Sequence, residues 1–358
     1  MCSYIIMKYL LGFMVLVCCC ISCNDGQQKG RFLFPFDDFK KLQGTVIYEE
    51  LFWGNPARFY VLDSLLFVSD KYDGKHLTIL NLNTGQEKRS VNFGDGPDDL
   101  MQVRDISYNK HTEALALWDS RLKKVSIYSV EGDTIYRKDT ERISKEGYNI
   151  SRVYDVIQFA GGYISNGCFA KGEQFVWVNR GREPVFFGEY PGDKTGMEIG
   201  GTFFLKTQTI MAANPNQEYF AAAGVFDDQL VFYRHEGGSF QKIKEYFSID
   251  SQVKTRYNKQ GNRESFSSSI TPETIHSYQA LYPTESYLYA AYWGISEKEL
   301  DEKSERLTYI MKFDWNGTFQ EGYMIPRLIS RFAVDEYRRC FYTTILNGED
   351  YNLMQYNM

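Results

Sequence analysis

The sequence predicts an all-β fold, a six-bladed β-propeller closed by its own N-terminal strand. The first observation is the stretch 58–85, in which three short apolar runs alternate inward and outward and are separated by turn signals. The second is that the same plan recurs about five more times along the chain. The third is an aromatic content of 16%, with 27 Tyr and 26 Phe, which favours strands over helices.

Each repeat predicts one antiparallel meander, which cannot bury both of its faces alone. In the first repeat the apolar runs are residues 59–61, 66–68 and 77–82, and the turns between and after them fall at 63–64, 73–74 and 83–85. Equivalent positions in the second strands are Leu66, Leu115, Gly162, Tyr219, Leu288 and Phe341. Their spacing of roughly 47 to 69 residues is within or somewhat above that of a four-stranded blade, about 40 to 50 residues.

The end of the chain predicts how the ring closes. A chain of 358 residues exceeds the usual size of one domain, but an all-β domain reaches this length. The last repeat ends with its third strand, residues 352–356, and lacks a fourth. We expect the strand-like residues 45–48 to supply it, because closure removes two open sheet edges. The alternative is a β-sandwich followed by a second domain.

The first 22 residues are predicted to be a lipoprotein signal peptide. Lys8 supplies a positive charge, and residues 9–21 are an apolar run too short to span a bilayer well. The motif Cys20-Ile21-Ser22-Cys23 resembles a bacterial lipobox, and this resemblance implies that Cys23 would be lipidated. The alternative is an uncleaved membrane anchor. Residues 23–42 then form a tether and residues 43–358 the propeller.

Two of the seven cysteines, Cys168 and Cys340, lie in the predicted propeller. They fall in the third and sixth repeats, on opposite sides of a six-membered ring and too far apart for a disulfide. We expect both to be buried free thiols.

Two segments depart from the repeat. Residues 239–274 lengthen the link between the fourth and fifth units, and their polar part, 254–263, predicts an exposed loop. Such an insertion is either a functional loop or a tolerated surface excursion. Residues 296–306 are rich in helix formers, and Ser296 and Glu299 have the spacing of a capping box, which predicts a short solvated helix.

Several short sequence motifs in and near the first repeat resemble those of a known family. Gly54-Asn55-Pro56-Ala57-Arg58 and the strand pair 61–70, followed by residues 93–100 (FGDGPDDL), look like the TolB-like six-bladed propeller lipoproteins of Bacteroidota. In that family a glycine-arginine-glycine-proline-acidic word commonly joins the first two blades, and here Asp95 stands in place of the arginine. The resemblance covers most of the mature chain and implies a secreted, membrane-tethered propeller. The resemblance is more informative about the architecture of this chain than about its biochemical function.

Chemical motifs are mostly absent. The sequence has no G-x-S-x-G, no H-E-x-x-H and no P-loop, and no histidine has a histidine partner at metal-ligand spacing. We therefore expect no metal, no other cofactor and no assigned catalytic residue. The formal net charge of −6 lacks the basic balance of a nucleic-acid-binding protein.

Aligning the repeats reveals one constellation of basic residues. They stand just before or near the first strand of six units: Arg58, Arg104, Arg152, Lys206, His276 and Arg331. First strands of a propeller line the central channel, so equivalent positions fall on one ring at one mouth. Several guanidinium groups there would attract a carboxylate, phosphate or sulfate. The alternative is that each arginine pairs with a neighbouring acid such as Asp105, Asp155 or Asp335.

Two other candidate sites are weaker. The loop 95–99 (DGPDD) offers carboxylates to calcium but lacks the spacing of an EF-hand loop, so we expect a structural turn. Tyr292 and Trp293 are candidates for an aromatic platform under a sugar ring, although packing between blades is the commoner fate of such a pair.

Two classes of function stay open. The first is a lipid-anchored envelope propeller that acts as a non-enzymatic binding or interaction module for an anionic glycan, a peptide or an envelope partner. The second is a propeller enzyme, a metal-dependent lyase or lactone hydrolase acting on a carbohydrate-derived substrate. Basic residues outnumber histidines at the predicted mouth, which favours the first class, and fold alone does not decide between them.

Overall fold

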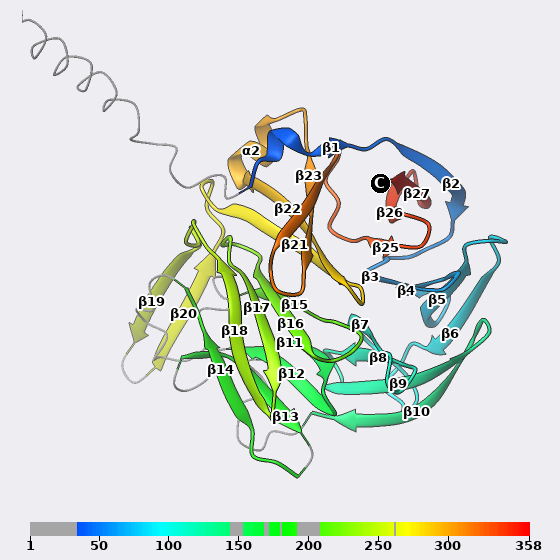
Figure 1. Ribbon diagram of the computed structural model, residues 1–358, viewed down its shortest axis with the longest axis horizontal. Coiled ribbons are helices and arrows are strands. Elements are labelled where there is room, and N and C mark those ends of the chain that lie inside the picture. The colour runs from blue at the N-terminus through cyan, green and yellow to red at the C-terminus, as the bar shows by residue number, and fades with distance from the viewer. Residues whose placement is uncertain (1–33, 144–152, 168–171, 180, 192–207, 261–262) are drawn as a thin grey trace, which may run out of the picture. The chain divides into compact units, whose positions relative to one another are not determined.

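The computed structural model describes residues 34–143, 153–167, 172–179, 181–191, 208–260 and 263–358. The chain divides into two units, Met1–Pro35 and Phe36–Met358. All described secondary structure belongs to the second unit, which is almost entirely β-strand (Figure 1). Among the described residues, no helix has the length and apolar character needed to cross a membrane.

The second unit is a six-bladed propeller, as predicted. Blade 1 contains β3 (Arg58–Leu62), β4 (Leu65–Tyr72), β5 (Lys75–Asn81) and β6 (Glu87–Asn92), and blade 2 contains β7 (Val103–Asn109), β8 (Ala114–Asp119), β9 (Lys124–Glu131) and β10 (Thr134–Arg142). Blade 3 contains β11 (Val153–Phe159), β12 (Gly162–Gly167), β13 (Glu173–Asn179) and β14 (Val185–Glu189).

The remaining blades repeat this order. Blade 4 contains β15 (Thr209–Ala213), β16 (Tyr219–Gly224), β17 (Leu230–Glu236) and β18 (Ser239–Tyr246), and blade 5 contains β21 (Ile275–Pro283), β22 (Tyr287–Ser296), β23 (Thr308–Asp314) and β24 (Phe319–Ile325). Blade 6 contains β25 (Ala333–Asp335), β26 (Cys340–Asn347), β27 (Asp350–Asn357) and β2 (Gly44–Leu51).

The first strand of each blade faces the centre of the ring. β3 contacts β7 and β25, β11 contacts β7 and β15, and β15 contacts β21. The first strands of neighbouring blades therefore lie side by side around the centre of the ring. The six blades are seen in Figure 1. Each blade lies between two others, so its second strand is buried on both faces; in β4, every residue from Leu65 to Asp70 is buried.

The N-terminal strand closes the ring, as predicted. β2 pairs antiparallel with β27, and Val46 lies opposite Met354. Gly44 lies opposite Tyr356, and a Cβ at Gly44 would lie 2.5 Å from the Tyr356 ring. The outer strand of blade 6 thus comes from the other end of the chain, which places the N-terminal strand and the last repeat in one sheet.

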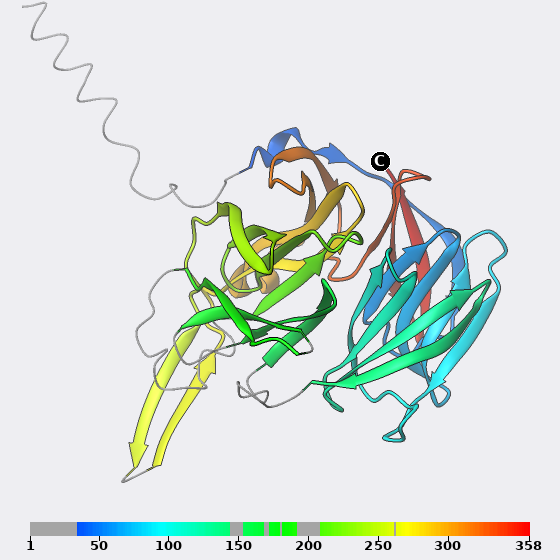
Figure 2. The same ribbon diagram turned by 60° about the horizontal axis from the view of Figure 1, so that its bottom comes forward.

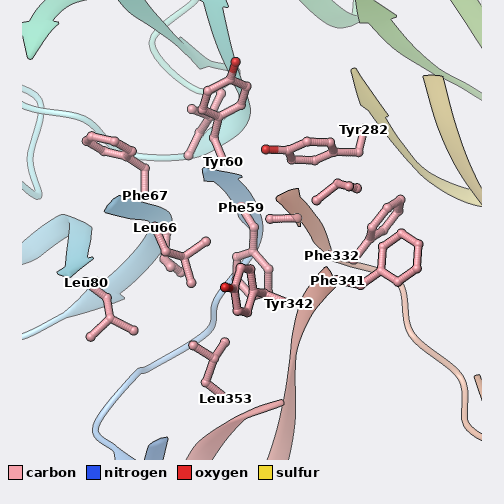
Figure 3. Packing of buried hydrophobic residues seen from close by; sticks show 14 of the residues in the cluster. Phe59, Tyr60, Leu66, Phe67, Leu80, Tyr282, Phe332, Phe341, Tyr342 and Leu353 are labelled. Carbon is pink, nitrogen blue, oxygen red and sulfur yellow. The ribbon is translucent and has the colours of Figure 1, made fainter. Parts of the chain in front are cut away.

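Apolar side chains from blades 1 and 6 pack across this closing seam (Figure 3). Leu66 of blade 1 and Phe341 and Leu353 of blade 6 are fully buried in one cluster. Burying one such side chain contributes about 1.5–3 kcal/mol, so the seam is held by packing as well as by strand pairing. Cys340 is buried and free, as expected, whereas Cys168 lies outside the described residues.

Residues just before β2 pack on blade 5. The 3-10 turn η1 (Phe36–Asp38) leads into β1 (Lys40–Lys41), which pairs parallel with β24. Phe36, Phe39 and Leu42 are buried, and the Phe39 ring lies where Gly322 leaves room for it. The predicted tether boundary at residue 42 therefore lies inside the folded unit, because three apolar side chains bury themselves on the blade.

The insertion between blades 4 and 5 forms strands where an exposed loop was expected. Its first part is β18, and its polar part forms a separate two-stranded hairpin of β19 (Lys254–Gln260) and β20 (Arg263–Ser269). Figure 2 shows this hairpin projecting away from the blades. The loop prediction was wrong because strand pairing satisfies backbone groups that a long irregular excursion leaves unpaired.

The predicted short helix is present as α2 (Glu297–Glu302). The Ser296 hydroxyl accepts a hydrogen bond from Glu299 N at 3.3 Å, and the Glu299 carboxylate accepts one from Ser296 N at 3.0 Å. This reciprocal pair is the capping box that the spacing indicated.

Candidate ligand site at the channel mouth

The central channel is too narrow to hold more than water. Its cavity measures about 50 Å³ and is lined by the first strands of the blades, which contribute small residues such as Ala212, Ala213 and Ala280. A bound water needs roughly 10–15 Å³ of such volume, so the cavity holds a few waters at most. A ligand of any size must bind outside it.

Three ionisable side chains line the channel. Asp105 and Asp155 line the cavity together with Arg58. Burial raises the pKa of Asp105, the charge of Asp155 raises it further, and Arg58 acts in the opposite direction. Burial also raises the pKa of Asp155, against the lowering effects of Arg58 and Arg104. Two carboxyl groups thus share one nearby guanidinium and hold protons more tightly than free aspartates do.

A larger hollow lies at the mouth where the first strands of blades 1 and 2 begin. This mouth pocket measures about 570 Å³, and its charged lining comprises Lys71, Arg104, Arg121 and Arg331. No acidic side chain among the described residues lines it. The pocket shares Arg331 and Ala57 with the channel cavity, so the two hollows adjoin. The mouth pocket is therefore cationic and stands over a carboxylate-containing channel.

Backbone hydrogen bonds hold Arg121 at the pocket. Asp119 is fully buried, and its Oδ1 accepts hydrogen bonds from Arg121 N and Leu122 N, each at 2.9 Å. Its Oδ2 accepts a further bond from Met101 N at 2.6 Å. One buried carboxylate therefore fixes both the turn that carries Arg121 and the segment that precedes Arg104.

Lys71 and Arg331 are held by neighbouring groups as well. The Lys71 ammonium lies 3.7 Å from the centre of the Phe93 ring, a cation–π contact at the pocket wall. Arg331 is half-buried, and burial lowers its pKa, with the charge of Arg58 adding to the effect. The Thr343 hydroxyl donates to Arg331 O at 2.7 Å, which fixes the backbone there.

The predicted pairing of arginines with acids is only partly realised. Asp335 pairs with Arg338 at 2.6 Å rather than with Arg331. Within the described part of the chain, Arg104 and Arg331 form no ion pair closer than 4.0 Å. Arg58 donates a hydrogen bond to its neighbour Ala57 and interacts with the channel carboxylates through charge alone.

The structure separates the predicted basic ring into parts. Arg104 and Arg331 line the mouth pocket, and Arg58 lines the channel below it. His276 does not line either hollow; its Nε2 lies 2.5 Å from Glu297 Oε2 at the start of α2. Arg152 and Lys206 lie outside the described residues.

The expected aromatic platform at Tyr292 and Trp293 is not open. Tyr292 is buried, and its ring stacks on Phe36 at 5.7 Å. Trp293 Nε1 donates to Ile329 O at 2.8 Å, which ties blade 5 to the segment before blade 6. Both rings therefore serve packing rather than ligand contact.

Hydrogen bonds from a buried lysine hold the loop between blades 1 and 2. Lys124 is only 3% exposed, and its Nζ donates to Pro97 O at 3.2 Å and Gly96 O at 3.4 Å. Arg137 pairs with Asp98 on the outer side. Among the described residues no three His, Cys, Asp or Glu side chains are grouped for a metal ion. The Lys124 ammonium thus contacts the backbone carbonyls of this loop from within the fold.

Sequence reasoning missed Lys71, His76 and Arg121 as pocket residues. They lie on or beside the turns between the second and third strands of blades 1 and 2, whereas the repeat alignment considered only positions before first strands. The Asp119-Ser120-Arg121 turn word was visible in the sequence, but its position at the mouth follows from the blade geometry.

Comparison with known proteins decides the family. The model of the TolB-like 6-blade propeller-like family matches residues 35–337. The chain belongs to the TolB-like six-bladed propeller family. A search of curated proteins found no match to this TolB-like propeller.

Two solved structures share the fold of this TolB-like propeller. One is a protein of Bacteroides fragilis NCTC 9343 described as exported, with a TM-score of 0.54 and 14% identity, covering 88% of this chain and 94% of that one. The other is a member of the duf4221 family from Bacteroides vulgatus ATCC 8482, with a TM-score of 0.53 and 10% identity, covering 89% and 97%. At these identities the similarity establishes the fold alone.

Proposed function

We propose that this TolB-like propeller is a non-enzymatic binding module that holds an anionic ligand in the mouth pocket. The observation that carries the proposal is the charge of the lining: four cationic side chains, from blades 1 and 2 and from the segment before blade 6, and no acid among the described residues. A hollow built this way matches a ligand with more than one negative group.

The chemistry of these side chains favours binding over proton transfer. A guanidinium keeps its proton near neutral pH and donates through a planar fork that fits a carboxylate, sulfate or phosphate. Arg104 and Arg121 are exposed and form no ion pair within the described residues, so an incoming anion displaces only water from them. Their contribution to binding is therefore not offset by a lost internal pair.

We further propose that the chain is exported and anchored in the cell envelope by a lipid on Cys23. The lipobox-like word supports this, as does the fold shared with an exported Bacteroides fragilis protein. Labelling cells with radioactive palmitate tests it: the wild type is expected to carry label and the Cys23→Ala variant none. Equal labelling of both proteins argues against the anchor.

Melting temperatures of the full chain test the ligand site. Sulfate, phosphate, citrate and galacturonate, each compared with sodium chloride at equal ionic strength, are expected to raise the melting temperature of the wild type. A ligand at 100 times its Kd stabilises by about 2.7 kcal/mol. The double variant Arg104→Ala/Arg121→Ala is expected to lose most of this shift.

The matched control removes two cations elsewhere. Arg234 and Lys298 are exposed on β17 and α2, outside the mouth pocket. The control Arg234→Ala/Lys298→Ala is expected to keep the shift of the wild type. Equal shifts in the mouth double variant and the wild type would overturn the proposed function.

A further inference from the structure

Two exposed aromatic residues are close in sequence to residues that line the mouth pocket: Tyr72 follows Lys71, and Phe52 lies two residues before Gly54. Phe52 is 57% exposed and Tyr72 is 40% exposed. Tyr72 also lies close to Gly54, which lines the pocket: a Cβ at Gly54 would lie 3.7 Å from the Tyr72 Cβ. We name Phe52 and Tyr72 the aromatic rim.

Arg89 fixes the aromatic rim. Its guanidinium carbon lies 4.2 Å from the centre of the Tyr72 ring, and its Nη2 donates to Phe52 O at 2.8 Å. Arg89 also lies 3.9 Å from Glu87, whose carboxylate accepts a hydrogen bond from the buried Trp53 at 2.8 Å. One face of the Tyr72 ring is thus covered by a held cation, and the ring is preorganised before any ligand arrives.

The size of the mouth pocket indicates a ligand with a body as well as charge. Its volume of about 570 Å³ far exceeds one sulfate or phosphate ion and falls in the range of sites for larger small molecules, about 300–1,000 Å³. The four cationic side chains come from blade 1, blade 2 and the segment before blade 6. This arrangement suits a ligand whose negative groups are separated along its length.

The uncharged lining suits hydroxyl groups. Asn55, Gln102 and His76 also line the pocket. His76 is 5% exposed, and its Nδ1 has no hydrogen-bond partner among the described residues. Hydroxyl groups both donate and accept, so they complement amides and an imidazole whichever tautomer is present. Phe93, Met101 and Val103 add apolar surface to the lining.

We propose that the ligand is an acidic saccharide, a chain of sugar rings that bear carboxylate or sulfate groups. This rests on the proposed function and names the ligand class of the same site. The C–H face of one sugar ring packs on the open face of Tyr72, beside Phe52. Acidic groups on the adjoining rings reach the guanidinium groups of Arg104 and Arg121, and hydroxyls contact the polar lining.

Calorimetric titration of the full chain with defined hexamers tests this inference. The acidic probes are oligogalacturonate, oligomannuronate and chondroitin sulfate, and the comparison probe is hexaglutamate, a peptide of similar charge. At least one acidic saccharide is expected to bind ten times more tightly than hexaglutamate. Hexaglutamate binding as tightly as every saccharide, or no saccharide binding at all, would overturn the inference. A preference for galacturonate and mannuronate or for the sulfated hexamer distinguishes carboxylate from sulfate recognition.

Variants of Tyr72 separate stacking from charge. Tyr72→Ala is expected to weaken saccharide binding about tenfold while leaving the sulfate-induced melting shift unchanged, and Tyr72→Phe is expected to keep saccharide binding. Tyr136→Ala is the matched control, because Tyr136 is 51% exposed on β10 and lies outside the pocket lining. If Tyr72→Ala binds the saccharide as tightly as the control does, the saccharide inference is contradicted and the proposed function is not. Failure of Arg104→Ala/Arg121→Ala to change any anion response sinks the proposed function.

Discussion

Asp119 accepts a hydrogen bond from the backbone N–H of Arg121 and so fixes the turn that carries this arginine into the mouth pocket. The carboxylate is fully buried and satisfies two further backbone donors. Replacing Asp119 with Ala is therefore expected to lower the free energy of unfolding by about 2–4 kcal/mol, because three backbone N–H groups lose their acceptor. Urea denaturation measures this; a variant as stable as the wild type would contradict the account.

The pairing of β2 with β27 in blade 6 gives a second prediction. A Cβ at Gly44 would lie 2.5 Å from the buried Tyr356 ring, so Gly44→Ala is expected to lower the free energy of unfolding by about 1–3 kcal/mol. Thr45→Ala is the control, because Thr45 is exposed on the same strand and should change stability by less than about 0.5 kcal/mol. Equal stability of the two variants in urea would argue against β2 as a packed closing strand.

The loop between blades 1 and 2 depends on Lys124. Lys124→Met keeps much of the apolar stem and removes the donor to Gly96 and Pro97, so it is expected to cost about 1–3 kcal/mol in urea denaturation. Lys88→Met, which removes an exposed pair with Asp133, should cost less than about 1 kcal/mol. If the Lys124 variant proves no less stable than the Lys88 variant, the loop is held by something else.

The channel carboxyl groups predict how stability changes with pH. The folded state raises the pKa of Asp105 and Asp155, so it binds protons more tightly than the unfolded chain. Their contribution to stability is therefore greatest at acid pH and falls as the pH rises from the ordinary carboxyl range, about 4, toward neutrality and above.

Replacing one channel carboxylate tests that sign. Asp105→Asn leaves one carboxylate with Arg58 and is expected to raise the free energy of unfolding by about 1–2 kcal/mol at pH 8. At pH 4.5, where Asp105 of the wild type holds its proton, the gain should largely vanish. Urea denaturation at both pH values decides; a loss of stability of equal size at both would show that the carboxylate is needed as an acceptor instead.

The architecture could be predicted from the sequence because the same pattern of apolar runs and turns recurs in every blade. Turn residues between the apolar runs located the second strands. The last repeat lacked a fourth strand after residue 356, and β2 supplies it by pairing with β27, where Val46 lies opposite Met354. The packing of Phe39 on blade 5 was not foreseen, because a single aromatic residue in a polar stretch carries no strand period.

The site was predicted only where it follows from the repeat. Arg104 and Arg331 stand before first strands and do reach the mouth pocket, whereas His276 stands at an equivalent position and turns to Glu297 instead. Lys71 and Arg121 reach the same pocket from turns on other strands. The twist of the blades and the lengths of the loops decide which turns meet at one mouth of the channel. Neither property appears in the sequence as a regular residue spacing.

Locating a bound oxyanion tests the central claim most directly. Crystals of the full chain soaked in sodium selenate, with diffraction recorded at the selenium edge, place the anion by its anomalous signal. The account predicts a peak within the mouth pocket, in hydrogen-bond reach of Arg104 or Arg121, and its loss in Arg104→Ala/Arg121→Ala crystals. Selenate bound at other places on the protein, with an empty mouth pocket, would contradict it.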